Sequence, residues 1–471
     1  ACRGSLAGIE STSSMPRHAA PSSTIQGSAE MTHPYRKLSS AALLVFISLQ
    51  LTAADDWPQW RGPAGQGHSN ATGLPAEWGK EKNISWKTDL PGRGWSSPVI
   101  AGEQVWLTTA HETLASAEAK KERLKANTGG QPLIVLETVR LHAICLDRKT
   151  GKILHDIEVL TKKEPQWVHE LNSYASPTPL LEKGRLYCHF GSYGTACVDT
   201  ASAKVLWRNQ ELKVMHENGP GSTPVLWKNR VIFHMDGSDK QYIAGLDAKT
   251  GKLAWKTERS GKMNKNPQLK KAYGTPLVLA IDGKEHVVSP AADWLYGYDP
   301  STGKELWRLN YGVLGFSNVP RPVAGNGMIF LSTSFMRAQI LAIRYGESSN
   351  PSISWRHKRS VPKTSSPILI GKELYFVSDA GGVVTCLDAL TGKVHWQERI
   401  KGNHSSSPTY ADGKLYFHSR EGVTTVIKPG KEKLEVLANN QLPGRHMSSL
   451  AIVGKALFLR TDKSLYRIEK N

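Results

Sequence analysis

One nine-residue phrase recurs along this chain and restricts its fold more than any other feature. The phrase Asp-x-x-Thr-Gly-Lys-x-x-Trp is complete at 247–255, 299–307 and 388–396. Altered copies occupy 199–207 and 147–155, and in the second His155 replaces the tryptophan. The copies recur about every 40–50 residues, which is the period of propeller blades.

Each residue type in the phrase has a structural role. The Asp side chain accepts hydrogen bonds from the backbone of a turn. Glycine adopts the positive φ that other residues resist. Tryptophan is large and flat, so it can wedge against the neighbouring blade. The phrase therefore predicts architecture rather than chemistry.

A second marker, a small residue before proline, opens the first strand of each unit. Proline suits the first residue of a strand, where no ladder donor is needed. We place the eight markers at 96–98, 175–177, 222–224, 274–276, 320–322, 365–367, 406–408 and 448–450. Two of them depart from the pattern, Pro-Arg-Pro at 320–322 and Ser-Ser-Leu at 448–450. Outer strands then begin near residues 153, 205, 253, 305, 353, 394 and 433, and the strand around Trp86 completes the last blade. The sequence thus predicts one all-β, eight-bladed propeller of four-stranded blades, closed by an N-terminal strand.

The chain divides around this propeller. Residues 84–471 carry the repeats, and residues 55–83 form an N-terminal extension. An insertion of about 111–139 interrupts blade one, and its residues 115–125 are strong helix formers.

The first 54 residues contain a targeting signal. Arg36 and Lys37 precede an apolar run, 41–51, and small residues then lead to Asp55. We expect a secretory signal peptide over 31–54, cleaved near Ala54, and upstream sequence of low information over 1–30. No cysteine directly follows the apolar run, so we expect no lipoprotein anchor. The mature protein is expected to be secreted or periplasmic.

The charge and the cysteines limit the partners. The formal net charge is +19, but many lysines occupy the repeated turn and are spread around the rim. This pattern does not favour nucleic acid, and it leaves an anionic polysaccharide or a membrane surface open. Cys188 and Cys197 flank a predicted hairpin tip, so a disulfide between them stays open. Without Cys-x-x-Cys, we predict no metal site.

The repeated phrase resembles the tryptophan-docking repeat of pyrroloquinoline-quinone (PQQ)-like β-propellers. The opening Asp56-Trp57-Pro58-Gln59-Trp60-Arg61-Gly62-Pro63 is similar to that of secreted PQQ-like and BamB-like repeat proteins. The resemblance implies an eight-bladed propeller. It does not settle activity, because the family includes quinoprotein dehydrogenases as well as scaffolds that bind no cofactor.

Loops from each outer strand to the next inner strand meet at one mouth of the channel, and we take them as the candidate binding site. The candidates are Arg93, Trp95, His169, Glu170, Asn172, His216, Glu217, Asn218, Lys271, Arg321, His404 and Arg445. Hairpin loops on the same side add Asp236, Asp239, Asp293, Asp379 and Arg420. A solvated ring of loop residues, a ligand or peptide site, and a quinoprotein site with PQQ and Ca²⁺ all remain open for this mouth.

The sequence-based hypothesis is a monomeric, non-catalytic scaffold with no cofactor. Its partner is a protein or peptide at the propeller mouth or the blade edges. The alternatives are a PQQ- and Ca²⁺-dependent alcohol or sugar dehydrogenase, and a protein that binds an anionic envelope polymer. A dehydrogenase of this type often carries two adjacent cysteines, and this chain has no such pair.

Overall fold

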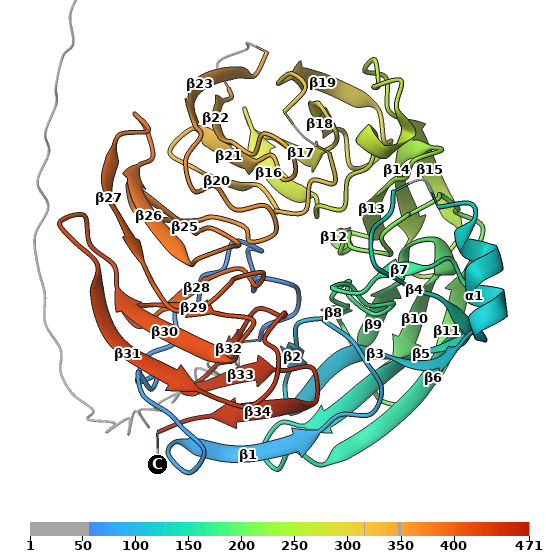
Figure 1. The fold of residues 1–471 in the computed structure, drawn as a ribbon, viewed down its shortest axis with the longest axis horizontal. Coiled ribbons are helices and arrows are strands. Elements are labelled where there is room, and N and C mark those ends of the chain that lie inside the picture. The colour runs from blue at the N-terminus through green and yellow to red at the C-terminus, as the bar shows by residue number, and fades with distance from the viewer. Residues whose placement is uncertain (1–55, 128, 315, 347–349, 471) are drawn as a thin grey trace, which may run out of the picture. The chain divides into compact units, whose positions relative to one another are not determined.

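The strands of the protein form a ring of blades around a central axis (Figure 1). The computed structural model describes residues 56–127, 129–314, 316–346 and 350–470. Within these residues there are eight four-stranded antiparallel sheets, which confirms the predicted eight-bladed propeller. The expected signal peptide of residues 31–54 and the upstream residues 1–30 lie outside the described residues.

The first four blades follow the chain in order. Blade one consists of β2 (Val99–Ala101), β3 (Gln104–Leu114), β5 (Leu136–Asp147) and β6 (Ile153–Lys163). Blade two consists of β8 (Leu180–Glu182), β9 (Arg185–His189), β10 (Thr195–Asp199) and β11 (Val205–Asn209). Blade three consists of β12 (Val225–Trp227), β13 (Arg230–Asp236), β14 (Gln241–Asp247) and β15 (Leu253–Glu258). Blade four consists of β16 (Leu277–Ile281), β17 (Lys284–Pro290), β18 (Trp294–Tyr298) and β19 (Glu305–Asn310).

The last four blades end with the strand that closes the ring. Blade five consists of β20 (Val323–Gly325), β21 (Met328–Ser332), β22 (Ile340–Arg344) and β23 (Ser352–His357). Blade six consists of β24 (Ile368–Ile370), β25 (Glu373–Val377), β26 (Val383–Asp388) and β27 (Val394–Arg399). Blade seven consists of β28 (Thr409–Ala411), β29 (Lys414–His418), β30 (Val423–Lys428) and β31 (Glu435–Gln441). Blade eight combines β32 (Ala451–Val453), β33 (Ala456–Arg460) and β34 (Ser464–Ile468) with β1 (Ile84–Asp89).

The ring closes through pairing of its first and last strands. β1 runs antiparallel to β34, with Thr88 opposite Leu465 and Asp89 opposite Ser464. The two strands lie side by side at the lower edge of the ring in Figure 1. Closure satisfies the backbone groups that a linear array would leave on an open edge. This confirms the predicted role of the N-terminal strand.

The repeated phrase links blade three to blade four. In blade three, Asp247 Oδ1 accepts hydrogen bonds from the Thr250 amide and hydroxyl, both at 2.9 Å. Trp255 of the same blade donates from Nε1 to the Pro300 carbonyl of blade four at 3.2 Å. Its ring lies against the turn glycine of blade four, Gly303, which has φ +73°. The predicted wedge between blades is therefore confirmed.

A ring of hydroxyl groups surrounds the axis just before the inner strands begin. Backbone amides donate to the hydroxyl of the next blade at 2.9–3.1 Å, which links neighbouring blades. The hydroxyls belong to Ser97, Thr178, Thr223, Thr275, Ser366, Ser407 and Ser449. Each lies two residues before its inner strand, so the marker of blade two is Thr178-Pro179. The predicted marker at 175–177 was displaced by two residues, because Ser176-Pro177 mimics the same pattern.

Arg321 occupies the corresponding position in blade five. Its amide donates to Ser366 Oγ at 2.9 Å, as the pattern requires. Its side chain is buried and donates from Nη1 to the Trp60 carbonyl oxygen at 3.2 Å. Blade five therefore uses a long cation where the other blades use a small hydroxyl residue, and this cation reaches the N-terminal extension.

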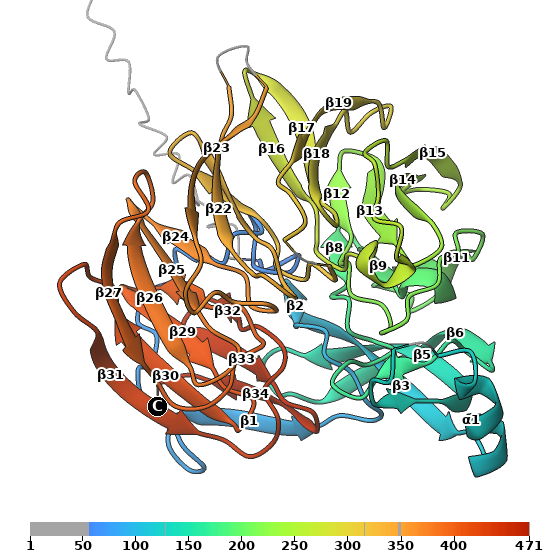
Figure 2. The same cartoon turned by 45° about the horizontal axis from the view of Figure 1, so that its top comes forward.

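The N-terminal extension runs behind the centre of the ring, where Figures 1 and 2 show it in blue. Trp57 exchanges backbone hydrogen bonds with Ile100 of blade one, and the Pro58 carbonyl accepts from Leu181 of blade two. Gln66 Oε1 accepts from Ala324 of blade five at 2.7 Å. Further contacts reach Pro367 of blade six and Tyr410 of blade seven. The extension therefore crosses one end of the channel and touches most blades.

The irregular part of the blade-one insertion is shorter than the predicted 111–139. β3 continues to Leu114 and β5 already begins at Leu136, so much of the predicted 111–139 insertion prolongs a hairpin. Helix α1 (Ala117–Leu124) lies inside the predicted helix of 115–125, and Ser116 caps its N-terminus. The helix lies on the outside of the ring in Figure 1. The short strand β4 (Leu133–Ile134) pairs with β7 (Val168–His169) and ties the insertion to the following loop.

The cysteine pair left open by the sequence does not form a disulfide. Cys188 lies opposite Ala196, and Cys197 lies opposite Tyr187. Because side chains alternate along a strand, this one-residue offset sends the two thiols to opposite faces of the sheet. Both cysteines are free and buried, in two separate core clusters.

The helices of the described residues are short. None of them has the length and apolar character needed to cross a membrane.

Candidate functional site

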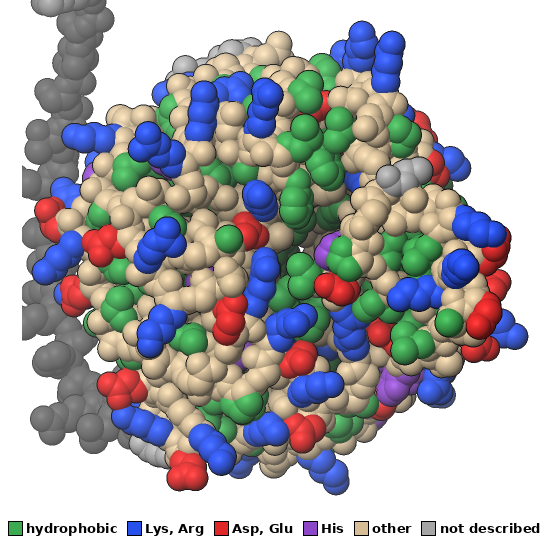
Figure 3. Space-filling model, in the orientation of Figure 1, with side chains coloured by type: hydrophobic (Ala, Val, Ile, Leu, Met, Phe, Trp, Pro, Cys, Tyr) green, Lys and Arg blue, Asp and Glu red, His purple; other side chains and the backbone are tan. Residues whose placement is uncertain are grey.

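A pocket of about 740 Å³ opens at one mouth of the channel. Figure 3 shows this hollow at the centre of the face, bordered by apolar, cationic and acidic side chains. The volume lies in the range of small-molecule pockets. Lys and Arg side chains are otherwise scattered over the face and alternate with acidic ones, so no single basic patch dominates it.

Aromatic side chains from several blades form the apolar part of the pocket. Trp60 comes from the N-terminal extension, and Trp95 from the loop between β1 and β2. Tyr273 and Phe316 come from the loops that enter blades four and five, and Phe335 from the β21–β22 hairpin. These rings offer broad faces for an apolar group.

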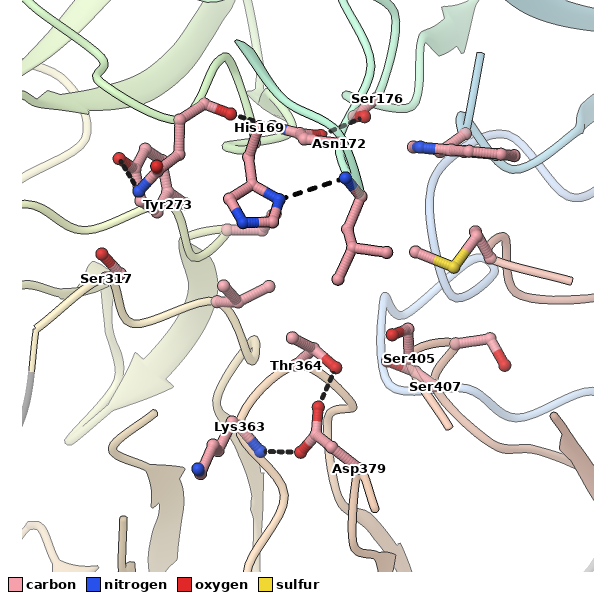
Figure 4. Close-up of a pocket in the computed structure, with 18 of the residues that line it drawn as sticks. His169, Asn172, Ser176, Tyr273, Ser317, Lys363, Thr364, Asp379, Ser405 and Ser407 are labelled. Atoms are coloured by element: carbon pink, nitrogen blue, oxygen red, sulfur yellow. Dashed lines mark hydrogen bonds between the residues drawn. The ribbon is translucent and has the colours of Figure 1, made fainter. Parts of the chain in front are cut away.

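Hydroxyl groups form the inner wall of the pocket. Most of the hydroxyl ring around the axis lines it, together with serines of the loops entering blades seven and eight. Ser405 and Ser407 are labelled on this wall in Figure 4. Hydroxyls can both donate and accept hydrogen bonds, so this wall suits polar ligands without demanding one charge.

Three cations and one carboxylate line the pocket: Lys271, Lys363, Arg420 and Asp379. Lys271 Nζ donates to Gln268, and burial lowers the pKa of Lys271 to about 8. Lys363 Nζ lies 5.8 Å from the Phe335 ring centroid. The charge of the lining is therefore positive, and it favours a ligand with an acidic group.

Asp379 is engaged by its own neighbourhood. Its two oxygens accept from the Lys363 amide and the Thr364 hydroxyl, as Figure 4 shows. Arg420 Nη2 lies 3.8 Å from Asp379 Oδ1. Burial raises the pKa of Asp379, against the effect of these partners. The carboxylate therefore fixes the loops of blades six and seven.

His169 and two asparagines form the opposite polar wall. His169 Nδ1 accepts from the Leu171 amide at 3.1 Å, which leaves the Nε2–H as the donor that faces the pocket. Burial lowers the pKa of His169, so its ring is neutral at pH 7. Asn172 Nδ2 donates to the Asn218 carbonyl at 2.8 Å, and Asn172 Oδ1 accepts from Ser176. This network joins the loops of blades two and three.

The structure places five of the twelve sequence candidates in the pocket lining: Trp95, His169, Asn172, Asn218 and Lys271. Asp379 and Arg420 of the hairpin loops join them. The other seven candidates are not among the described residues that line the pocket.

Two of these seven are buried histidines that hold loops. His216 Nε2 accepts from the Ser192 amide at 2.8 Å, and burial lowers the pKa of His216 to about 4. His404 Nδ1 bonds the His418 carbonyl at 2.9 Å, and burial likewise lowers the pKa of His404 to about 4. Neither ring faces the pocket.

The remaining five support or surround the mouth. Arg93 donates to the carbonyls of Glu170 and Asn172 at 2.7 and 2.5 Å, and so braces the loop that carries His169. Glu217 Oε1 accepts from Ser238, and Arg445 is exposed. The Glu170 side chain is exposed as well, whereas Arg321 lies beneath Trp60 as described above.

The sequence did not point to several lining residues. Trp60 was known only as part of the opening phrase, and its place on the axis depends on the path of the extension. Phe335 lies in a hairpin tip, Ser334-Phe335-Met336, where an exposed aromatic side chain was an available signal. Gln131 reaches the pocket from the insertion and donates to Asn218 Oδ1 at 3.3 Å.

The pocket lining matches only part of the PQQ and Ca²⁺ pair that the family resemblance implies. The three cations match the carboxylates of PQQ. A Ca²⁺ ion takes six to eight oxygen ligands, typically with several carboxylates. Asp379 is the one acidic residue of the described lining, and its oxygens already accept two hydrogen bonds. The residues therefore fit an organic anion but do not fit the calcium ion.

The chain is similar to curated proteins over part of its length. The outer membrane protein assembly factor BamB of Legionella pneumophila is 27% identical over 174 residues, which span 35% of this chain and 42% of that protein. The BamB of Shewanella oneidensis is 21% identical over 297 residues, which span 59% of this chain and 69% of that protein. The chain thus spans less than half the length of the first of these relatives.

Solved structures share the fold at low identity. BamB from Moraxella catarrhalis superposes with a TM-score of 0.52 and 12% identity, over 82% of this chain and 99% of that chain. A quinohemoprotein alcohol dehydrogenase from Comamonas testosteroni gives a TM-score of 0.58 and 11% identity, over 89% and 81%. Because both likenesses are distant, they show the propeller and not the activity.

A family comparison covers nearly all of the propeller. The sequence pattern described as outer membrane protein assembly factor BamB matches residues 72–218, 142–383 and 349–469. These overlapping matches follow the repeat from the N-terminal extension to the last blade. The chain belongs to this BamB family of repeat propellers.

Proposed function

We propose that this protein is a non-catalytic scaffold of the cell envelope that holds a segment of another protein at the channel mouth. The observation that carries the proposal is the composition of the pocket, which combines aromatic faces, a hydroxyl wall and an excess of cations. The family description, which names outer membrane protein assembly, supports a protein partner and an envelope location.

The pocket indicates the chemistry of the bound segment. Trp95, Phe316 and Phe335 offer apolar surface, and an aromatic or aliphatic side chain of a partner would bury against them. Lys271 and Lys363 favour an acidic side chain or a terminal carboxylate beside it. We therefore propose an extended segment that carries an apolar residue next to a carboxylate.

The polar groups of the mouth also support binding over catalysis. The carboxylate of Asp379 is bound by loop groups, and the neutral His169 is held through Nδ1. A general base needs access to a substrate proton, and each Asp379 oxygen is already held by one hydrogen bond from a neighbouring loop. The mouth residues thus act as a shaped, positively charged receptor.

Capture from the native envelope fraction tests the proposal. The variant Lys271→Gln with Lys363→Gln removes both lysine charges from the mouth, and Lys249→Gln with Lys393→Gln removes two exposed lysine charges at blade turns as the matched control. Because a charge-assisted hydrogen bond contributes about 1.5–3 kcal/mol, we expect the mouth variant to bind its partner at least about tenfold more weakly.

The control variant is expected to capture the same partner as the unmodified protein. Equal capture by the mouth variant and by the unmodified protein would contradict a partner site at the mouth. Capture lost equally in both variants would instead indicate binding through dispersed surface charge.

A further inference from the structure

A cluster of two histidines and two carboxylates lies on one face of blade one, away from the pocket lining. His111 belongs to β3, His142 to β5, and Asp156 and Glu158 to β6. The strand register places His142 directly opposite Glu158. These three strands have 11, 12 and 11 residues, because the insertion prolongs the hairpin beyond the usual blade. Figure 3 shows histidine and acidic surface at the rim where Figure 1 draws β5 and β6.

The side chains of the cluster converge. One ring nitrogen each of His111 and His142 and one oxygen of Asp156 lie within 4.8 Å of one another. The two ring centroids are 4.3 Å apart. His142 Nδ1 is 2.6 Å from Asp156 Oδ1, and His142 Nε2 is 4.0 Å from Glu158 Oε2.

Hydrogen bonding sets the roles of the two His142 nitrogens. An Nδ1–H donated to Asp156 leaves Nε2 as a bare lone pair. His142 is 8% exposed, and its Nε2 has no hydrogen-bond partner among the described residues. The Nε2 of His111 is buried without a partner as well. Buried polar atoms without partners are destabilising, and a Lewis acid bound to both nitrogens would remove this cost.

We propose that His111, His142 and Glu158 bind a divalent transition-metal ion, with Zn²⁺ as the best match. Imidazole and carboxylate are established zinc ligands, and sets of three protein ligands leave a fourth position to water. A carboxylate that accepts from the second ring nitrogen of a histidine ligand fixes its tautomer, and Asp156 is so placed. Asp156 is therefore a positioning residue and His142 a ligand.

The separation of His142 and Glu158 suits such a site after a small side-chain rotation. Ligand atoms around tetrahedral zinc are about 3.3–3.5 Å apart, given bond lengths near 2.0–2.1 Å. The 4.0 Å separation of His142 Nε2 and Glu158 Oε2 is close to this value. Glu158 Oε1 accepts from the Thr161 hydroxyl at 2.5 Å, which leaves Oε2 for the metal. Arg140 lies opposite His111 on the same face, and the two carboxylates outweigh its charge.

Bound metal would clamp the strands that carry the insertion. The three proposed ligands come from three different strands, and the insertion between β3 and β5 sends Gln131 to the pocket. A ligand that binds only the folded state raises stability. The site is thus a proposed structural metal centre that goes beyond the scaffold function.

Titration of the full chain without an affinity tag tests the proposal. After treatment with a chelator, calorimetry with Zn²⁺ and the visible absorption of added Co²⁺ report affinity and coordination. We expect one Zn²⁺ in this cluster and an upward shift of the melting temperature. His111→Gln and His142→Gln are expected to abolish this binding event and the Co²⁺ spectrum. Asp156→Asn is expected to weaken binding roughly 10–100-fold, as for other residues that orient metal ligands.

The matched control is His155→Gln. This histidine lies on β6 with Asp156 and Glu158, and its ring stacks on that of Trp106 with 6.3 Å between the ring centroids. Its Zn²⁺ affinity is expected to equal that of the unmodified chain. Glu158 is exposed, so Glu158→Gln is expected to preserve the fold while it weakens Zn²⁺ binding. Failure of the unmodified chain to bind Zn²⁺, or unchanged binding in His142→Gln and Glu158→Gln, would overturn the proposal.

Discussion

The guanidinium of Arg321 donates a hydrogen bond to the carbonyl oxygen of Trp60 at 3.2 Å and so joins blade five to the segment across the channel. Both Arg321 and the nearby Arg61 are buried, and burial lowers the pKa of each to about 9. Arg61 donates to the Pro367 carbonyl of blade six at 2.8 Å. The floor beneath the pocket thus depends on two buried cations held by carbonyl oxygens.

The other blades have serine or threonine at the position of Arg321. Replacing Arg321 with serine should loosen this floor without unfolding the ring. In Arg321→Ser, a serine restores the hydroxyl found in the other blades, but the bond to Trp60 is lost. A hydrogen bond from a charged group contributes about 1.5–3 kcal/mol, so local opening should become at least about tenfold more frequent. Hydrogen exchange at Gly62, Gly65 and Gly67 measures it, because their amides are bonded within the segment.

The exposed Arg344 at the end of β22 provides the control for that experiment. Arg344→Ser should leave exchange over 57–68 unchanged. Equal acceleration in both variants, or none in Arg321→Ser, would mean that Arg321 does not hold the segment.

The wedge between blades predicts an unequal effect of two similar substitutions in blade four. Gly303→Ala and Gly283→Ala both introduce a side chain at positive φ, +73° and +74°. A Cβ at Gly303 would lie 2.4 Å from the Trp255 ring, whereas a Cβ at Gly283 meets no atom within 4 Å. Gly283→Ala should cost roughly 1 kcal/mol in free energy of unfolding, and Gly303→Ala a further ~1–3 kcal/mol from overpacking.

Denaturant unfolding of the two variants measures this difference. Equal loss of stability in both would show that the Trp255 contact does not hold blades three and four together.

Buried histidines predict that the protein loses stability as the pH falls. Burial lowers the pKa of His216, His404 and His446 to about 4 each. Between pH 6.5 and 4 the unfolded chain therefore binds more protons than the folded one, so the free energy of unfolding decreases as pH falls. Each histidine contributes up to about 3 kcal/mol across this window. Asp293, whose pKa burial raises to about 6, acts in the opposite direction, but three histidines outweigh it.

Denaturant unfolding at a series of pH values between 7 and 4 measures this dependence. His446→Leu removes one of these groups, and neither of its ring nitrogens has a hydrogen-bond partner among the described residues. The variant should show a shallower slope than the unmodified protein. A stability that is constant over this range would contradict the assignment of neutral buried rings.

The pocket lining predicts the outcome of reconstitution with PQQ. Lys271 and Lys363 can attract the quinone carboxylates, but Asp379 is the one carboxylate of the described lining, and both of its oxygens already accept hydrogen bonds. A calcium ion needs more oxygen ligands than this. We expect PQQ to bind no more tightly with Ca²⁺ than without it, and dye reduction with alcohols or sugars to stay at background. Calcium-dependent binding together with substrate oxidation would revive the dehydrogenase alternative.

The fold was predictable because its signals are local and repeated. Asp247, Gly251 and Trp255 each have a role within one turn and one neighbouring blade, so their spacing alone fixed the blade pattern. Pairing of the Trp86 strand with the last blade followed from a missing fourth strand. The marker of blade two was predicted two residues too early, because Ser176-Pro177 and Thr178-Pro179 have the same pattern.

The candidate site was predictable only in part, because long-range contacts decide which polar side chains face the pocket. His216 and Asn218 lie two residues apart, yet the ring of His216 turns away to bond Ser192. Arg321 is a loop residue by sequence, but its place in the hydroxyl ring directs it beneath Trp60. Trp60 itself reaches the axis only through the path of the N-terminal extension, for which the sequence carries no periodic signal.

Photocrosslinking at the pocket tests the central claim most directly. A benzophenone amino acid at Phe335, in the pocket lining, is compared with one at Leu437, an exposed residue of the outer strand β31. In the native envelope, we predict a light-dependent adduct with a protein partner at 335 and none at 437, and we predict its loss in the Lys271→Gln, Lys363→Gln background. Absence of an adduct at 335, or adducts of equal yield at both positions, would contradict a protein-binding site at the channel mouth.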